Sequence, residues 1–262
     1  MSAELKIVNT KHGLFFISNP NETIQKHLIK FGEFEHNLVD FASRLLKIKP
    51  GFVLDVGANI GTFSIPLAKQ FPNCEFMAFE PQRIVYHHLV SNVFLNKLQN
   101  ITLNRNVISD CEKKQFRVPF FDISENYTGS VSLDENVIYK RSKIRGVAEP
   151  GSYAKNYDFV NVVKLDEVVS SNVSLIKIDV EGMELSVLKS AKSILKNNSL
   201  IVLFETWDLP EFAHENKAIY EFLSNIGYRS FKIKNDSVAC KQEDSKLTKF
   251  IEESGLLISE KI

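Results

Sequence analysis

The sequence has few cysteines and no net charge. Its three cysteines, among 262 residues, are too scattered for a disulfide framework and form no CxxC or Cys/His zinc spacing. This usage is typical of the reducing cytoplasm, so we expect a cytoplasmic protein. Lysine plus arginine and aspartate plus glutamate both number 32, so no overall field attracts nucleic acid or an anionic membrane. We therefore expect no nucleic-acid partner.

Long apolar runs are also missing. The first ten residues include Glu4 and Lys6 and lack the apolar centre of a signal peptide. No stretch approaches about 18 uninterrupted apolar residues, so we expect no membrane span. What is present, 44% hydrophobic and 24% charged residues, is typical of a globular protein. The length favours one α/β domain with an insertion.

Strand and helix patterns alternate through most of the chain. Apolar residues recur at three- and four-residue steps over 21–48, which predicts an amphipathic helix before Pro50-Gly51. The composition and periodicity predict strands over 52–56, 75–79, 101–109, 174–180, 200–205 and 228–234, with helices over 61–70, 83–98, 184–195 and 212–225. A last hairpin strand within 235–245 and a short helix over 247–253 complete the pattern. The alternation predicts a doubly wound, mostly parallel, seven-stranded α/β sheet.

The alternation is interrupted between residues 111 and 170. Short strands are predicted there over 114–121, 130–133 and 160–165, separated by residues that favour turns. We therefore expect a single domain with four parts: an N-terminal helical cover (1–49), a cofactor-binding half of the sheet (50–110), an inserted β-rich lid (111–170) and the second half of the sheet (171–262).

One loop carries the strongest functional signal. The segment Leu54-Asp55-Val56-Gly57-Ala58-Asn59-Ile60-Gly61 lies between a predicted strand and a predicted helix. In an open α/β sheet, ligands bind outside the carboxyl ends of the strands. Glycines such as Gly57 and Gly61 would let the backbone turn tightly and approach a ligand closely. The loop therefore predicts a nucleotide-like ligand.

Three side chains favour S-adenosylmethionine (SAM) over NAD. A dinucleotide fingerprint has glycine where this chain has Asn59. Asp55 at the strand end would repel a pyrophosphate but suits a ligand with an ammonium and a sulfonium. Glu80 ends the second predicted strand, where an acidic side chain accepts hydrogen bonds from both ribose hydroxyls. The remaining interpretation is a tight structural turn beside a solvated carboxylate.

Several spaced blocks resemble the FkbM family of methyltransferases, from about Phe34 to Trp207. The blocks are Pro50-Gly51 with the loop above, Ala78-Phe79-Glu80-Pro81, Asn92 with Leu95-Asn96, Val107-Ile108-Ser109-Asp110, Lys164-Leu165-Asp166-Glu167, and Ile176-Lys177-Ile178-Asp179-Val180-Glu181-Gly182-Met183-Glu184. The resemblance implies a Rossmann-like class I methyltransferase that moves the SAM methyl group to a hydroxyl, typically on a sugar or a polyketide. It also implies that Glu80, Pro81, Ser109 and Asp110 lie at the cofactor, the last two near the adenine. The 111–170 segment matches poorly.

A second constellation comprises Lys177, Asp179 and Glu181. They alternate along a predicted strand and its exit, so they share one face and end over the crevice. A hydroxyl acceptor loses a proton as it attacks the methyl group, so Asp179 would act as general base or orient the acceptor. Lys177 would compensate this charge or lower the acceptor's pKa, and Glu181 would hold the acceptor or cap the next helix. A strand-end ion pair with a purely structural role is an equal alternative.

Other groups give weaker signals. Asp179 and Glu205, with Asp208 and His214, could hold a divalent ion, but no ligand spacing is diagnostic and we assign no metal. Trp207 would line a substrate pocket or pack under a loop. A basic cluster would suit a nucleotide sugar or phosphorylated glycan, although solvated charges explain it as well; it comprises Lys140, Arg141, Lys143 and Arg145, with Tyr127, Tyr139, Tyr153 and Tyr157 around it. His87 and His88 are expected at the surface.

The sequence thus favours SAM-dependent O-methylation of a small-molecule or glycan acceptor. Two alternatives remain: a SAM-binding scaffold without turnover, and an NAD-dependent enzyme on a similar sheet. The acceptor depends on loops that vary within one fold, and no oligomeric state follows from the sequence.

Overall fold

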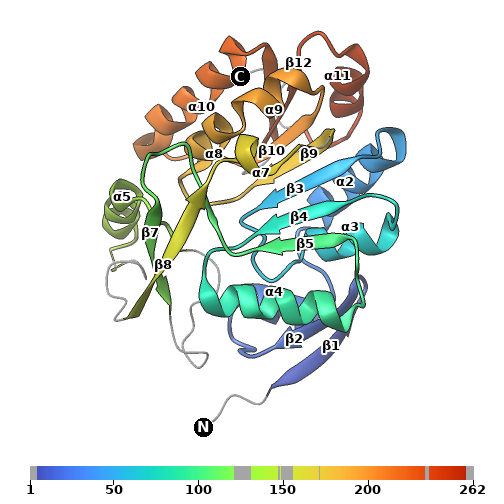
Figure 1. Cartoon of the computed structure of the whole chain (residues 1–262), viewed down its shortest axis with the longest axis vertical. Helices are drawn as coiled ribbons and strands as arrows, with labels where there is room; N and C mark the ends of the chain where they lie inside the picture. Colours follow the sequence, from blue (N-terminus) through green and yellow to red (C-terminus); the bar gives the residue numbers. More distant parts are fainter. Residues whose placement is uncertain are drawn as a thin grey trace.

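A seven-stranded sheet forms the centre of the computed structural model, which describes residues 5–120, 131–146, 148, 156–170, 172–233 and 236–257. The strand order is β11-β12-β10-β9-β3-β4-β5 (Figure 1). In that order the strands are Tyr228–Ile233, Asp236–Lys241, Ile201–Glu205, Val173–Ile178, Phe52–Val56, Phe76–Phe79 and Ile101–Asn104. Neighbouring strands are parallel except that β12 runs antiparallel to both β10 and β11. The predicted doubly wound, mostly parallel α/β sheet is confirmed.

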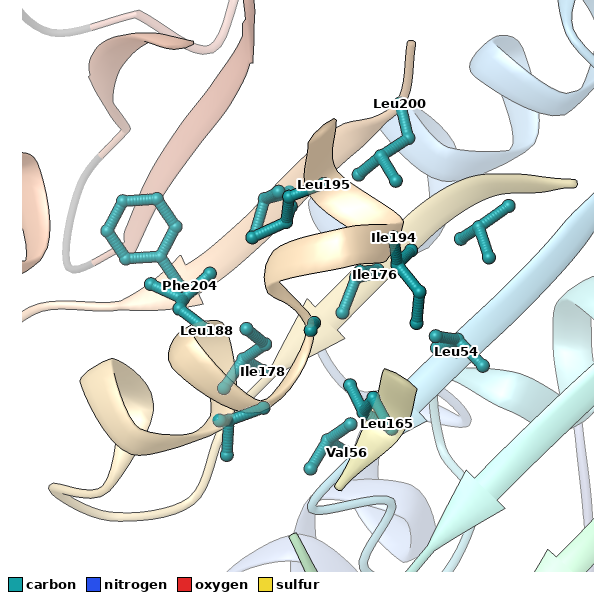
Figure 2. Packing of buried hydrophobic residues seen from close by; sticks show 14 of the residues in the cluster. Leu54, Val56, Leu165, Ile176, Ile178, Leu188, Ile194, Leu195, Leu200 and Phe204 are labelled. Carbon is teal, nitrogen blue, oxygen red and sulfur yellow. The ribbon is translucent and has the colours of Figure 1, made fainter. Parts of the chain in front are cut away.

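Alternation along the strands distributes apolar side chains to two faces. Leu54 and Ile176 point to one face and Val53 and Leu175 to the other. The first face is covered by α7 (Leu165–Val168), α8 (Glu184–Ser190), α9 (Lys192–Asn197) and α10 (Ala213–Asn225), and Figure 2 shows the residues that pack there. The second face is covered by α2 (His36–Ile48), α3 (Ser64–Gln70), α4 (Arg83–Leu95) and α11 (Ser245–Glu252). Helices on both faces leave the carboxyl ends of the parallel strands open for a site.

The N-terminal segment is more complex than one helix. A hairpin of β1 (Lys6–Thr10) and β2 (Gly13–Ile17), which the periodicity did not predict, precedes α1 (Thr23–Phe31) and α2. The expected continuous helix over 21–48 is wrong, because Gly32 ends α1 with φ 71° and Glu35 precedes α2 with φ 50°. Left-handed backbone at both positions turns the chain between the two helices.

The predicted strand over 101–109 divides between two sheets. After β5 the chain leaves the main sheet, and β6 (Val107–Ile108) pairs with β8 (Asn156–Val163), which also pairs with β7 (Gln115–Phe120). Arg83 and Arg105 both form ion pairs with Asp158 and tie this small sheet to the main one. The strand predicted at 130–133 is wrong for the described residues 131–133, which are irregular and lead into α5 (Glu135–Arg145).

The C-terminal half follows the prediction more closely. Ala191 divides the predicted helix over 184–195 into α8 and α9, and a 3₁₀ turn, η1 (Pro210–Phe212), precedes α10. The expected last strand and helix are β12 and α11. No helix in the described part of the chain has the length and apolar character needed to cross a membrane.

Candidate active site

The loop after β3 is shaped by contacts within the protein. Gly57, Asn59 and Gly61 all have positive φ, at 82°, 50° and 93°. A Cβ at Gly57 would lie 1.8 Å from the carbonyl oxygen of Asp179, and one at Gly61 would lie 2.6 Å from Ile65. The expected tight turn is confirmed, because the close neighbours of these glycines are the exit of β9 and α3. Their close approach to a ligand stays a prediction. The loop is held tightly against both.

Glu80 lies immediately after β4 and is bonded to this loop. Its Oε2 accepts a hydrogen bond from the Asn59 backbone N–H at 3.1 Å, and its Oε1 accepts one from Gln82 at 2.9 Å. Burial raises the pKa of Glu80 to about 7, although the hydrogen bonds from Gln82 and Asn59 oppose the shift. The backbone N–H of Asn59 thus helps to fix the Glu80 carboxylate at the carboxyl end of β4.

A cleft opens over the carboxyl ends of β3, β4 and β9, and we call it the β3–β4 cleft. It is lined by Val56, Gly57, Phe79, Glu80, Pro81, Gln82, Asn106, Val107, Ile108, Val131, Leu133, Asp179, Val180, Glu181 and Met183. Of the residues singled out in the sequence, the cleft unites Gly57, Glu80, Pro81, Asp179 and Glu181. Asn59 and Gly61 do not line the cleft, but the Asn59 backbone N–H bonds to Glu80, which does.

Ser109 and Asp110 lie outside the β3–β4 cleft. The Ser109 and Ser186 hydroxyl oxygens are 2.7 Å apart, and the Ser186 hydroxyl donates to Asp110 Oδ1 at 2.7 Å. Both residues line a neighbouring cavity instead. β6 pairs with β8, and the residues just before Ser109, 106–108, line the cleft. The assignment of Ser109 and Asp110 to the adenine therefore stays a prediction.

Lys177 occupies the centre of the buried charges. It faces Asp55 across the β3–β9 ladder. Its Nζ lies 3.8 Å from Asp55 Oδ1, and it donates to Asp179 Oδ2 at 3.1 Å and to the Gly57 carbonyl at 3.3 Å. Burial alone would lower the pKa of Lys177, but the carboxylates of Asp179, Asp55 and Glu35 raise it above its usual range. Lys177 therefore stays charged and links the loop to Asp179.

Asp55 is an internal anchor. Its side chain is fully buried, and its Oδ2 accepts a hydrogen bond from the Ser64 hydroxyl at 2.5 Å. Burial raises the pKa of Asp55, and Lys177 and Ser64 oppose that shift. Asp55 does not line the β3–β4 cleft, so the expectation of direct contact with a ligand's ammonium gives way to a role in holding Lys177.

The sequence did not identify two further carboxylates at this centre. Glu35, between α1 and α2, has a pKa raised to about 7 by burial, opposed by Lys177 and reinforced by Asp179. Asp236 begins β12 opposite Glu205, and burial followed by the charge of Asp179 raises its pKa to about 6. Glu35 lies three residues after Gly32 in the predicted helix, but its electrostatic interaction with Lys177 depends on the fold.

Three carboxylates converge where β9 and β10 end, and we call Asp179, Glu181 and Glu205 the acidic triad. One oxygen from each lies within 4.8 Å of the others. Burial, then the charges of Asp179, Glu181 and Glu184, raise the pKa of Glu205 to about 9. Its Oε2 is buried and has no hydrogen-bond partner among the described residues. Such a group can hold a proton or attract a cation.

Of the residues considered for a divalent ion, Asp179 and Glu205 meet in the acidic triad, whereas Asp208 and His214 are not part of it. Asp208 is 3.0 Å from Lys232 and its side chain is 65% exposed, so it is engaged outside the acidic triad. His214 lines the neighbouring cavity. Glu181, which the sequence assigned to the acceptor or a cap, takes the third place and accepts a hydrogen bond from Arg141 at 2.7 Å.

A second cavity, of about 400 Å³, lies beside Glu205. This α8–α10 cavity is bounded by α5, α8, α10 and the segment after β10, and Met183 lines both it and the β3–β4 cleft. Trp207 stands in its wall and packs against Phe212, with ring centres 4.4 Å apart. Trp207 thus packs against Phe212 and lines a cavity, and that this cavity takes the substrate stays a prediction. Glu205 of the acidic triad lines this cavity, whereas Asp179 and Glu181 line the cleft. The size of the cavity suits a small molecule.

The predicted basic patch is wrong as a single surface. Lys140 forms an ion pair with Glu215, Arg141 is buried, and Lys143 and Arg145 are exposed. Tyr139 is exposed, whereas Tyr157 lies under the Arg117 guanidinium in the small sheet. Tyr127 and Tyr153 fall outside the described residues.

The histidine prediction is half right. His87 is exposed, but His88 is buried and its ring meets Phe16 of β2 edge-on at 5.2 Å. Burial lowers the pKa of His88 to about 4. The unpredicted hairpin β1–β2 is what covers this side of α4.

One family model matches most of the chain. The model described as "Methyltransferase FkbM domain" matches residues 55–230. Methyltransferase sdnD of Sordaria araneosa is 26% identical over 194 residues, which cover 65% of this chain and 71% of that protein. Methyltransferase 1 of Beauveria bassiana (strain ARSEF 2860) is 23% identical over 171 residues, or 60% and 66% of the two chains. The solved structure of methyltransferase FkbM from Methylobacillus flagellatus KT aligns with a TM-score of 0.49 and 17% identity over 79% of this chain and 48% of that chain.

Proposed function

The chain belongs to the FkbM methyltransferase family, and from this premise we propose that it transfers the methyl group of SAM to a hydroxyl oxygen of a small molecule. The family establishes a SAM-dependent methyltransferase. The oxygen acceptor, which we take to be a sugar, a glycan precursor or a polyketide-like compound, is our inference. The observation that carries it is the position of Asp179, where the β3–β4 cleft meets the acidic triad.

The residues of the β3–β4 cleft fit SAM. When bound, SAM supplies an electrophilic methyl group on a sulfonium centre. Each Glu80 oxygen accepts one backbone N–H and keeps a further lone pair for a ribose hydroxyl. The acidic triad next to it favours a ligand with positive charge and disfavours the pyrophosphate of NAD. Glu80, Pro81 and Gly57 would therefore hold the cofactor, with Asp55, Asn59 and Gly61 supporting them.

Asp179 is placed to receive the proton of an acceptor hydroxyl. The Lys177 Nζ lies 3.1 Å from Asp179 Oδ2, and 34% of the Asp179 side chain is exposed. A charged lysine that fixes one oxygen leaves the carboxylate oriented and able to contact an acceptor. Alignment of the acceptor oxygen with the methyl group would supply much of the rate acceleration.

Glu181 and Glu205 would serve the acceptor in different ways. Arg141 engages Glu181, so this carboxylate is held in place. With a pKa near 9, Glu205 carries a proton at neutral pH and can donate a hydrogen bond to an acceptor oxygen. The α8–α10 cavity beside it would take the body of the acceptor.

Calorimetry and methyl transfer test this function. We expect the protein to bind SAM and not NAD, and to transfer labelled methyl from SAM to members of a panel of hydroxylated sugars and polyketide-like compounds. Binding of NAD but not SAM would overturn the assignment. Binding of SAM without transfer to any member would support a scaffold, and transfer that survives unchanged in Asp179→Asn would remove Asp179 from its role.

A further inference from the structure

Helix α5 reaches the candidate active site through one buried cation. The buried residues of α5 are Val137 and Arg141. The Arg141 guanidinium donates to Glu181 Oε2 at 2.7 Å and lies 5.5 Å from the centre of the Trp207 ring. Glu181 follows β9 and Trp207 follows β10. A single side chain from the insertion therefore contacts both segments that border the acidic triad.

The loop after β9 is shaped to receive this helix. Glu181 has a left-handed backbone, with φ 55°, and Gly182 follows with φ 110°. A Cβ at Gly182 would lie 2.6 Å from a methyl group of Val137. Strained backbone of this kind persists where the surrounding structure enforces it. The α5 contact thus depends both on the missing side chain at Gly182 and on the turn at Glu181.

Arg141 also alters the balance of charge in the acidic triad. Its side chain is 6% exposed and that of Glu181 is 18% exposed, so the pair is screened little by water. Lys177 engages Asp179 in the same way. Without Arg141, Glu181 would lose this buried ion pair while one of its oxygens stays within 4.8 Å of oxygens of two other carboxylates, and their repulsion would favour its displacement.

We propose that Arg141 is a positioning residue for methyl transfer: it holds Glu181 and Trp207 in place and thereby keeps α5 closed over the acceptor side of the site. The consequence for transfer rests on the proposed function, whereas the positioning itself does not. Arginine suits this role because its planar guanidinium can bond a carboxylate and stack on an aromatic ring at once.

The chain contains a single tryptophan, so its fluorescence reports on Trp207 alone. We would measure emission and quenching by acrylamide in the wild type, Arg141→Gln, Arg141→Lys and the control Lys143→Gln, which changes an exposed residue of the same helix. Loss of the cation over the ring should raise the quenching constant about two-fold or more in Arg141→Gln. Arg141→Lys should recover part of the effect, and Lys143→Gln should match the wild type.

The same variants separate positioning from general damage. Arg141 does not line the β3–β4 cleft, but its partner Glu181 does, so calorimetry should show a smaller loss of SAM affinity than the loss of kcat/KM in Arg141→Gln. With the acceptor found in the panel above, Arg141→Gln should lower kcat/KM about ten-fold or more, with partial recovery in Arg141→Lys. If the wild type transfers methyl to no acceptor, the proposed function fails, while Trp207 still reports on the positioning.

Unchanged quenching in Arg141→Gln, or an equal rise in Lys143→Gln, would overturn the proposal. Should Arg141→Gln fail to fold, Glu181→Gln decides in its place, because it removes the negative charge that pairs with Arg141 and keeps the shape of the side chain. We expect Glu181→Gln to raise the quenching of Trp207 as well. A folded Glu181→Gln protein with wild-type quenching would contradict the role assigned to Arg141.

Discussion

At the scale of single residues, several carboxyl groups of the site surround the buried lysine Lys177. Among the described residues, Asp55, Asp179 and Glu35 raise the pKa of Lys177, and Glu205 stands nearby with its own pKa near 9. Carboxyl groups that hold protons in the free protein become ionised when a cation arrives. This arrangement suits a sulfonium ligand.

Removal of the Asp179 charge should abolish most transfer. Asp179→Asn keeps the shape of a partly exposed side chain but cannot accept the acceptor's proton, so we expect kcat to fall about 100-fold or more. SAM affinity from calorimetry should change only a few-fold. Asp208→Asn is the matched control, since Asp208 is largely exposed and lies outside the acidic triad. Equal losses in the two variants would remove the special role of Asp179.

Glu205 should make the unliganded protein less stable as the pH rises. Its folded-state pKa, about 9, exceeds the ordinary value of 4.5, so the folded state binds more protons between those values and its free energy of unfolding decreases with pH there. Glu205→Gln should flatten this decline and raise the free energy of unfolding by about 1 kcal/mol or more at about pH 8. Urea unfolding at about pH 6 and about pH 8 measures both effects. A steeper decline in the variant would contradict this reasoning.

Removal of divalent metal should leave transfer unchanged. Lys177 and Arg141 already engage two of the three carboxylates of the acidic triad, and a cation would have to displace these partners. We expect dialysis against a chelator to preserve both SAM affinity and turnover. Loss of turnover that magnesium restores would show that the acidic triad holds a metal.

At the scale of elements, local sequence patterns predicted the strands and helices with regular apolar spacing. They did not predict elements that depend on contacts with distant residues. Strands β9 and β10 were predicted because buried strands have distinctive apolar runs. The glycine loop was predicted because it directly follows such a run. The hairpin β1–β2 was not predicted, because it is held by distant side chains and not by a further strand. Asn92 of α4 and Asn96 just after it form hydrogen bonds with the backbone of β2. Helix α5 was missed because it buries only two side chains, too few to produce a helical period.

Asn92 should prove important for stability although it lies outside the cleft. It is fully buried, accepts a hydrogen bond from Phe16 N–H at 2.7 Å, and donates to the Ile60 carbonyl at 2.8 Å. Asn92→Ala leaves both backbone groups without partners, so we expect a loss of about 2–4 kcal/mol in urea unfolding. Ser91→Ala, at a partly exposed position on the same helix, should cost under about 0.5 kcal/mol. Similar losses of unfolding free energy in both variants would show that the hydrogen bonds of Asn92 contribute little to stability.

At the scale of the whole molecule, the site draws on segments far apart in the sequence. Glu35 comes from the N-terminal cover, Glu80 from the β4 end, Asp179 from β9, Arg141 from α5 and Asp236 from β12. Sequence order placed Glu80 and Asp179 at one edge of the sheet because parallel strands share it. It could not place Glu35 or Arg141, whose positions depend on how the cover and the insertion pack.

The most direct test of the account is the destination of the methyl group. Wild-type protein would be incubated with SAM carrying a ¹³C-labelled methyl group and the hydroxylated acceptor panel, and the product would be examined by carbon NMR and by mass spectrometry. We expect a single labelled carbon with the chemical shift of a methoxy group, absent when Asp179→Asn replaces the wild type. A labelled methyl group on nitrogen, sulfur or carbon would contradict it.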